Sequence, residues 1–371
     1  DMELRQRIAR IAGAFALLAL AGCGARPGPE EGLSVTDLLG RTVTVPARVE
    51  RVVAIGPGAL RLYVYAGNLT YLAGIEQFEL DSAVGRPYWL ANPGLADLPV
   101  IGQGGPNNSP DAERLLEAAP DVILSTYATE VSAADELQSK TGIPVVAISY
   151  GTAGFGTTSI FGEPVLTSLD LIGRITGEEE RAAAAVAFLS AAQADLDRRG
   201  GETPESERPT VYVGALGARG THGIESTQGR YALLEAIHAR NVVDDTGMSG
   251  SLMVDREALL EWDPEVIILD QGGLTAVRED YAQNPRFYEA LSAVRAGRVY
   301  GQLPYNYYST NIDTAIADAY YLGTLLSPEA FSDIDPAARA DEIYTALLGA
   351  PAYAQMATDF GGFGPVALSG E

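Results

Sequence analysis

An alternation of strand-like and helix-like segments, which runs through the chain twice, constrains the fold more than any other feature. Runs of β-branched residues that stop at proline or glycine predict strands, and longer stretches with helical spacing predict helices. The first series has predicted strands over residues 41–46, 51–58, 69–75, 121–126 and 143–149 and predicted helices over 59–67, 111–120 and 133–142. Strands that alternate with helices in this way indicate a parallel α/β sheet.

One long helix is predicted between the two series. Residues 178–199 are rich in alanine, acidic at the start and basic at the end, which is the charge order that the helix dipole favours. A polar linker is predicted over 200–209. The second series has predicted strands over 210–216, 265–270 and 297–301 and predicted helices over 230–240, 257–264 and after Thr310. The predicted fold class is therefore α/β, with two α/β lobes and parallel-type sheets joined by one long helix.

The N-terminus has the pattern of a lipoprotein signal peptide. Arg5, Arg7 and Arg10 form a positive segment, residues 11–20 are apolar, and the small residues of "LAGC" end the pattern at Cys23, the only cysteine in the chain. The apolar run falls short of the roughly 20 residues that cross a bilayer. We therefore expect an extracytoplasmic protein of the cell envelope that is lipidated at Cys23 and anchored to a membrane there. The pattern leaves open which membrane holds the anchor.

About 350 mature residues are ample for two cores, because a single core stops growing near roughly 250 to 300 residues. With its one thiol carrying lipid, the mature body has no disulfide and depends on packing. The predicted domains are a lipoprotein signal peptide over 1–22, a tether over 23–32, an N-terminal α/β lobe over 33–163, a helical connection that includes the inter-lobe helix over 164–207, a C-terminal α/β lobe over 208–350 and a C-terminal extension over 351–371.

The chain is strongly acidic. Its formal charge is −24, and loss of the signal segment, which holds two acids and three arginines, makes the mature form −25. Such a body does not favour nucleic acid or anionic lipid surfaces. We therefore expect no nucleic-acid partner.

Motifs of catalysis and of nucleotide binding are missing from the sequence. It contains no G-x-S-x-G, no H-E-x-x-H and no G-x-x-x-x-G-K-[ST]. The glycine-rich stretch 214–230 also lacks the G-x-G-x-x-G spacing, and we interpret it as a pocket loop. His222 lies in this loop beside Glu225 and is a candidate for a ligand or metal contact, the alternative being a solvated loop histidine. These patterns favour a binding protein without an intrinsic cofactor over an enzyme.

Several motifs, taken in their order and spacing, carry a resemblance to a known family. They are the "LAGC" box, "DLLGRTVTVPARVERVVAIGPG", "DAERLLEAAPDVIL", the helix from Glu178, "GIESTQGRYALLEAIHARNVVDD", "MVDREALLEWDPEVIIL" and "LPYNYYSTNIDTAIADAYYLGTLL". The chain resembles the substrate-binding proteins of ABC transporters that have a single connecting helix between their lobes. Members of that family capture ferric siderophores, haem, cobalamin and related metal complexes.

The resemblance implies a ligand cleft between the lobes, lined by strand-to-helix loops. The stretch "LPYNYYST", residues 303–310, is such a loop, and its three tyrosines offer flat apolar faces and hydroxyl groups. The opposing lobe is expected to contribute the loop 56–61 and the stretch 78–89. The candidate ligand-binding residues are Tyr305, Asn306, Tyr307, Tyr308, His222, Glu225, Arg61, Arg86, Tyr88 and Trp89. The alternative for the aromatic residues is core packing, and for the arginines it is exposure to solvent.

The expected ligand is a ferric siderophore or another iron complex. A corrinoid such as cobalamin, haem, or an oxyanion such as molybdate are alternatives, and direct ligation of a metal by the protein stays open. Two other classes remain: a secreted α/β enzyme, which needs a base and a nucleophile within hydrogen-bond reach, and a structural lipoprotein without a cleft.

The partners implied by the resemblance are an ABC permease and its ATPase. In this family each lobe carries a surface glutamate that docks on the permease. The matching positions here are Glu113 and Glu235, for which the alternative is an ordinary solvated carboxylate. We expect the protein to act as a monomer.

Overall fold

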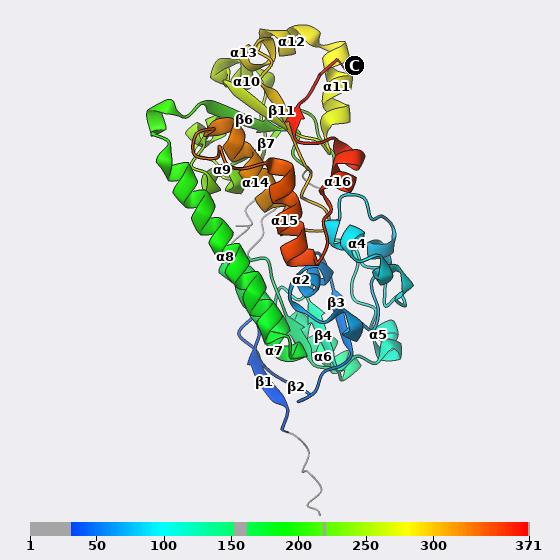
Figure 1. Ribbon diagram of the computed structural model, residues 1–371. Helices are drawn as coiled ribbons and strands as arrows, with labels where there is room; N and C mark the ends of the chain where they lie inside the picture. Colours follow the sequence, from blue (N-terminus) through cyan, green and yellow to red (C-terminus); the bar gives the residue numbers. More distant parts are fainter. Residues whose placement is uncertain (1–30, 152–161, 218–219, 370–371) are drawn as a thin grey trace, which may run out of the picture.

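The computed structural model describes residues 31–151, 162–217 and 220–369, which fold into two α/β lobes with the long helix α8 along one side (Figure 1). The N-terminal lobe and the connection contain β1 (Leu33–Thr36), β2 (Thr42–Val45), β3 (Val52–Ile55), α2 (Ala59–Ala66), α3 (Gln77–Leu80), α4 (Pro87–Ala91), α5 (Ala112–Ala118), β4 (Val122–Ser125), α6 (Val131–Thr141), β5 (Val145–Ala147), α7 (Glu163–Thr176) and α8 (Glu179–Glu202). The two-lobed α/β prediction is thereby confirmed.

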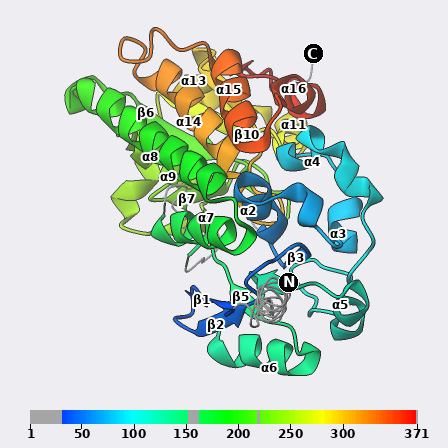
Figure 2. The same ribbon diagram turned by 60° about the horizontal axis from the view of Figure 1, so that its bottom comes forward.

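The N-terminal lobe is built on a parallel sheet in the order β3-β4-β5. All residues of these strands are buried, as expected for a parallel sheet that is covered on both faces. An antiparallel hairpin, β1–β2, lies beside β5 (Figure 2), where the amide of Leu38 donates to the carbonyl of Ala147 at 3.1 Å.

The C-terminal lobe contains β6 (Thr210–Gly214), β7 (Ser226–Gly229), α9 (Ala232–Ala236), β8 (Arg240–Asn241), β9 (Gly250–Met253), α10 (Arg256–Trp262), β10 (Val266–Asp270), α11 (Leu274–Gln283), α12 (Pro285–Ala290), α13 (Ser292–Arg295), β11 (Val299–Gln302), α14 (Ile312–Leu326), α15 (Pro336–Leu348), α16 (Tyr353–Phe360) and β12 (Gly364–Pro365). Its main sheet has the order β12-β11-β10-β6-β8, parallel except at β12. Strands β7 and β9 form a separate antiparallel pair. Within the stretch predicted as an extension, α16 and β12 are ordered parts of this lobe.

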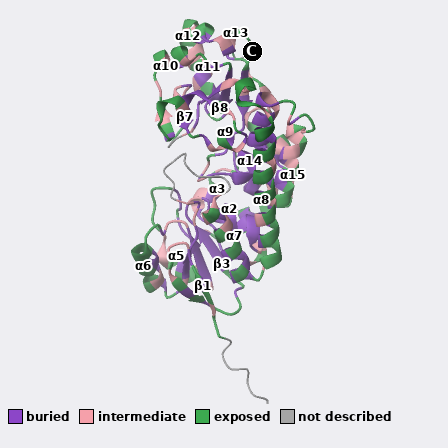
Figure 3. Ribbon diagram, turned by 90° about the vertical axis from the view of Figure 1, so that its left-hand side faces the viewer, coloured by how far each residue is buried: buried purple, intermediate pink, exposed green. Residues whose placement is uncertain are grey.

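Helix α8 packs against both lobes. Near its start, Arg181 donates to the carbonyl of Val64 in α2 at 2.7 Å. Near its end, Arg199 donates to the carbonyl of Ala330, and Asp195 accepts from the hydroxyl of Tyr320 in α14 at 2.9 Å. One hydrophobic core runs from β3 and α2 through α7 and α8 to α14 and α15, so the lobes share buried surface on this side. Figure 3 shows buried segments of the N-terminal lobe between the exposed outer faces of α6 and α8.

Several local features differ from the sequence-based prediction. The predicted helix 230–240 is shorter, because α9 spans only Ala232–Ala236 and Arg240–Asn241 belongs to strand β8. The predicted strand 69–75 is wrong: Leu69–Tyr71 forms a 3-10 turn, and only Leu72 and Ile75 make isolated parallel bridges. The turn forms because the side chain of Asn68 accepts from the amide of Thr70 at 3.0 Å. Strand β1 had no counterpart in the prediction. Helix α8 also continues to Glu202, three residues into the predicted linker.

Candidate functional site

The loop after β11, residues 303–310, forms a tight turn that we name the tyrosine corner. The amide of Asn311 donates to the carbonyl of Tyr305 at 2.7 Å, and the amide of Tyr307 donates to the carbonyl of Ser309 at 3.0 Å. Tyr308 and Ser309 both have left-handed backbone angles, with φ of 50° and 73°. Each such non-glycine residue costs on the order of 1 kcal/mol, so surrounding contacts must hold the corner in this shape.

Arg61 of α2 joins the tyrosine corner to the N-terminal lobe. Its guanidinium donates to the side-chain oxygen of Asn311 at 2.7 Å, to the carbonyl of Tyr307 at 2.7 Å and to the carbonyl of Tyr308 at 3.3 Å. Nη1, the nitrogen that binds Tyr308, also donates to the hydroxyl of Tyr150 at 3.1 Å. The side chain is completely buried, and within the described residues it forms no ion pair with a carboxylate. Arg61 is therefore a buried cation at the contact between the lobes.

Arg86, Tyr88 and Trp89 gather around one buried carboxylate, Glu79. Its Oε2 accepts from Arg86 at 2.8 Å, from the hydroxyl of Tyr88 at 2.5 Å and from the indole nitrogen of Trp89 at 3.1 Å. All four side chains are buried. The guanidinium of Arg86 also lies 4.4 Å from the ring centroid of Tyr307, so the corner covers it from the other lobe.

The hydroxyl of Tyr308 reaches into the N-terminal lobe. It donates to Oε2 of Glu76 at 2.8 Å and accepts from the amide of Gly105 at 2.9 Å. The hydroxyl of Tyr127, which follows β4, lies 3.1 Å away. Burial raises the pKa of Glu76 to about 7, because hydrogen bonds from Gly56 and Tyr308 only partly offset the loss of hydration. Three N-terminal segments thus meet at one phenol.

The remaining corner side chains point to different surroundings. Tyr305 is buried in the C-terminal lobe, with its ring centroid 6.4 Å from that of Tyr231. Asn306 is exposed and Tyr307 is half-buried. Asn306 and Tyr307 are therefore the side chains of the "YNYY" motif that retain accessible surface.

A buried polar cluster lies behind the corner. Asp318 of α14 accepts from the amide of Leu303 at 3.0 Å, and Gln302 donates to the hydroxyl of Tyr231 at 2.8 Å. Burial raises the pKa of Asp270, at the end of β10, to about 7. These groups fix the start of the corner from within the C-terminal lobe.

The glycine-rich loop carries His222 and Glu225 at the same end of the C-terminal sheet. Glu225 is paired with Arg256 of α10 at 2.8 Å, and Arg256 also pairs with Asp280 at 2.8 Å. His222 is half-buried, and its carbonyl oxygen lies 2.6 Å from the place that a Cβ on Gly273 would take. The loop therefore packs closely on the turn that precedes α11.

The two predicted docking residues lie on different lobes. Glu113 is exposed in the first turn of α5, which Asp111 caps by accepting from the amide of Arg114 at 3.1 Å. Glu235 lies on α9, is 42% exposed and pairs with Arg230 at 2.7 Å. Both carboxylates are accessible from solvent.

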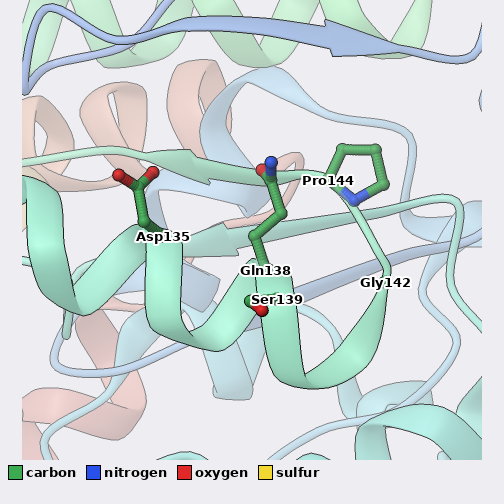
Figure 4. A pocket seen from close by; sticks show the side chains of 5 residues that line it. All are labelled: Asp135, Gln138, Ser139, Gly142 and Pro144. Carbon is green, nitrogen blue, oxygen red and sulfur yellow. The ribbon is translucent and has the colours of Figure 1, made fainter.

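An open depression on the N-terminal lobe lies apart from the tyrosine corner. It is lined by Asp135, Gln138, Ser139, Gly142 and Pro144, on α6 and the turn before β5 (Figure 4). Arg41 donates to Asp135 at 2.9 Å and to Gln138 at 3.3 Å. These two side chains of the depression therefore hold the β1–β2 hairpin in place. In the described ranges, no group of three or more His, Cys, Asp or Glu residues is arranged to hold a metal ion.

Sequence reasoning missed the partners that hold the corner. Glu76, Tyr127 and Asn311 were not among the candidates. Phe78 and Glu79 lie in the stretch 78–89 expected at the site but were not singled out, although the Phe78 ring packs at a tilt of 52° on the Tyr308 ring, with centroids 4.5 Å apart. One sequence signal could have pointed to buried, paired acids: Glu76 and Glu79 lie within the largely apolar stretch "LAGIEQFEL". Acids in such a stretch are rarely buried unless they are paired.

Two α/β lobes, with loops from the strand ends meeting between them and one long helix along the side, define a two-lobed solute-binding protein. A family model described as periplasmic binding protein matches residues 67–304, and the chain belongs to that family. It is the substrate-binding protein of an ABC transporter, which works with a permease and an ATPase, and it is not an enzyme. Among the helices of the described residues, none has the length and apolar character needed to span a bilayer.

The chain is similar to several known proteins. It is 26% identical over 317 residues to the molybdate-binding protein MolA of Haemophilus influenzae, covering 81% of this chain and 86% of MolA. It is 20% identical to the ABC transporter substrate-binding lipoprotein YvrC of Bacillus subtilis, covering 77% and 86%. A periplasmic solute-binding protein of Veillonella parvula has a similar structure, with a TM-score of 0.68, 20% identity and coverage of 88% and 96%.

Proposed function

We propose that the protein captures an anionic iron complex, such as a ferric siderophore, and delivers it to its permease. The observation that carries this proposal is the buried cation Arg61 beneath the tyrosine corner. A buried guanidinium that forms no ion pair within the described residues contributes a positive potential, which the nearby buried carboxyl of Asp313 offsets in part and which favours an anion. Tyr307 and Asn306 offer an aromatic face and an amide at the accessible side of the corner.

Direct contact with ligand is proposed for the accessible candidates, Asn306, Tyr307 and His222. For the buried candidates, Arg61, Arg86, Tyr88, Trp89, Tyr305 and Tyr308, we propose that they shape the site and set its potential. Glu225, which is paired with Arg256, is proposed to hold the glycine-rich loop.

A molybdate-like oxyanion is the second candidate ligand. The 26% identity to a molybdate-binding protein supports it. So does the burial of Tyr305 and Tyr308, because a corner with one accessible aromatic face suits a compact anion. Haem and corrinoids have less support for the same reason, since large planar ligands need more stacking surface.

Titration with defined ligands tests the proposal. Purified protein is titrated with a ferric catecholate, a ferric hydroxamate, molybdate, haem and cobalamin, with sulfate as the control anion. We expect an iron complex to bind. Tyr307→Ala should weaken its binding free energy by about 1 to 3 kcal/mol, the range for truncating an aromatic residue at the centre of a binding interface. Tyr281→Ala, a half-buried tyrosine on α11, is the matched control and should have no effect. Binding of molybdate alone would favour the second candidate, and binding of none would overturn both.

We also propose that the protein is anchored by lipid at Cys23, outside the described residues. The N-terminal pattern and the similarity to a substrate-binding lipoprotein support this. Cys23→Ser should then leave an unprocessed precursor without the mass of the lipid, whereas normal processing would contradict the proposal.

A further inference from the structure

We propose that Glu76 and Tyr308 form an inter-lobe latch, which holds the two lobes together without a contribution from a ligand. The inference goes beyond the proposed function, because it holds for whichever ligand the protein carries. The latch joins the N-cap residue of α3 to the tyrosine corner of the other lobe, across 232 positions of sequence.

Among the described residues, the Tyr308 hydroxyl is bonded to groups of the other lobe. A phenol has one proton to donate and two acceptor positions. The proton goes to Glu76, the amide of Gly105 donates to the oxygen, and the Tyr127 hydroxyl lies at 3.1 Å. The ring packs on Phe78 with a centroid distance of 4.5 Å. Every one of these partners belongs to the N-terminal lobe, so separation of the lobes breaks all of them together.

Glu76 is held as firmly as Tyr308. It is 4% exposed, and its Oε2 also accepts from the amide of Gly56 at 3.1 Å. A Cβ on Gly104 would lie 2.6 Å from the Cβ of Glu76, so the loop 104–105 closes directly over it. The N-terminal lobe thus holds this carboxylate on one side, and the tyrosine corner covers it on the other.

The strained backbone of the corner makes its shape depend on the latch. Tyr308 and Ser309 keep positive φ while Tyr308 is bound from the other lobe, by Arg61 at its carbonyl and by Glu76 at its hydroxyl. Without those contacts the left-handed angles are unfavourable, and the corner is expected to relax. The accessible face of Tyr307 thus takes its place only when the lobes are together.

Hydrogen exchange of the ligand-free protein tests the latch. Tyr308→Phe removes only the hydroxyl, and we expect exchange in peptides covering residues 103–108 and 304–310 to become about tenfold faster, as for loss of one buried hydrogen bond. The matched control is Tyr212→Phe, which removes a buried hydroxyl bonded to the carbonyl of Ile224 within one lobe. Equal exchange at residues 103–108 in the two variants would overturn the latch.

A second measurement uses the charge of Glu76. The groups that face it are Glu79, Tyr127 and Tyr308, with the amide of Gly56. Its pKa is raised by burial to about 7, so parting of the lobes, which hydrates the carboxyl, releases a proton. Opening is therefore favoured as the pH rises from about 4.5 to 7.

After correction for intrinsic exchange, wild-type protection at residues 103–108 should be more than tenfold higher at pH 5 than at pH 8. Glu76→Gln, which keeps the shape but cannot ionise, should show no such difference. An unchanged pH dependence in Glu76→Gln would refute the latch even if Tyr308→Phe fails to fold. Because no ligand is present in these measurements, the result is separate from the fate of the proposed function.

Discussion

At the scale of single residues, Arg61 shows how one side chain can join two lobes. The guanidinium is a planar fork whose nitrogens point in fixed directions, and here they meet acceptors on Tyr150, Tyr307, Tyr308 and Asn311. If Arg61 were replaced by a residue without these donors, each of the four acceptors would lose this hydrogen bond in an interior that excludes water. The residue therefore contributes to folding as well as to the potential of the site.

Arg61→Lys should be strongly destabilising although it keeps the charge. The ammonium group is compact and cannot reach acceptors in three directions, so we expect a loss of about 2 to 4 kcal/mol in the free energy of unfolding, measured with urea at pH 7. Arg51→Lys is the matched control, since Arg51 also donates to backbone carbonyls but is exposed. A loss at position 61 no larger than at position 51 would contradict this account.

The sequence predicted where the candidate site lies better than it predicted what each residue does there. An aromatic run at a strand-to-helix boundary is a local pattern, and it located the tyrosine corner. The partners of the corner are remote: Asn311 and Arg61 are separated by 250 positions, and Tyr308 and Glu76 by 232. No periodicity connects such positions, so neither the burial of Arg61 nor the role of Glu76 was predictable from one sequence.

At the scale of elements, the helix α8 was predictable from its own sequence, whereas the turn at residues 69–71 was not. The charge order and alanine content of α8 are properties of the segment itself, and they identified it to within a few residues. The stretch 69–75 has the composition of a strand, but one side-chain cap from Asn68 turns its first residues into a 3-10 helix. Such a cap involves a single hydrogen bond, which composition does not reveal.

Two adjacent glycines of α8 should respond in opposite ways to substitution by alanine. A Cβ on Gly200 would lie 2.4 Å from the backbone of Ile237, so Gly200→Ala forces the helix away from the C-terminal lobe and should lower stability by about 1 to 3 kcal/mol. Gly201 has no neighbour within 4 Å of that position, and Gly201→Ala should raise stability by up to about 1 kcal/mol through helix propensity. Thermal unfolding of both variants measures the difference. A change in melting temperature of the same sign for both variants would show that α8 does not pack as closely as described.

At the scale of the whole molecule, the two lobes form one continuous body on the side of α8. Buried residues of α2, α7, α8, α14 and α15 belong to a single hydrophobic core. The α8 residues Arg181 and Arg199 bind opposite lobes, at the carbonyls of Val64 and Ala330. Relative movement of the lobes is therefore limited to the side where the tyrosine corner lies.

Contact with the permease is proposed to involve Glu113 and Glu235. Replacing both with arginine should leave ligand affinity and the melting temperature nearly unchanged, because exposed charges contribute roughly 0 to 1 kcal/mol to stability. Ligand-stimulated ATP hydrolysis by the reconstituted transporter should fall sharply, since rim charges act on encounter and register.

The control for this double variant changes the charge equally at other exposed sites. Glu279→Arg with Glu342→Arg is suitable, because Glu342, like Glu235, has an exposed arginine-paired carboxylate. Full stimulation by the Glu113 and Glu235 variant, or equal loss in the control, would remove the docking assignment.

The shared core along α8 has a consequence for uptake in the cell. A body that is continuous on one side presents much the same outer surface whether or not it carries cargo. Empty copies then compete with filled copies for the same permease, and import depends on the fraction of copies that are occupied. Overproduction of the binding protein at a fixed, scarce supply of its cargo should therefore slow uptake, whereas a permease that admits only filled copies would show no such inhibition.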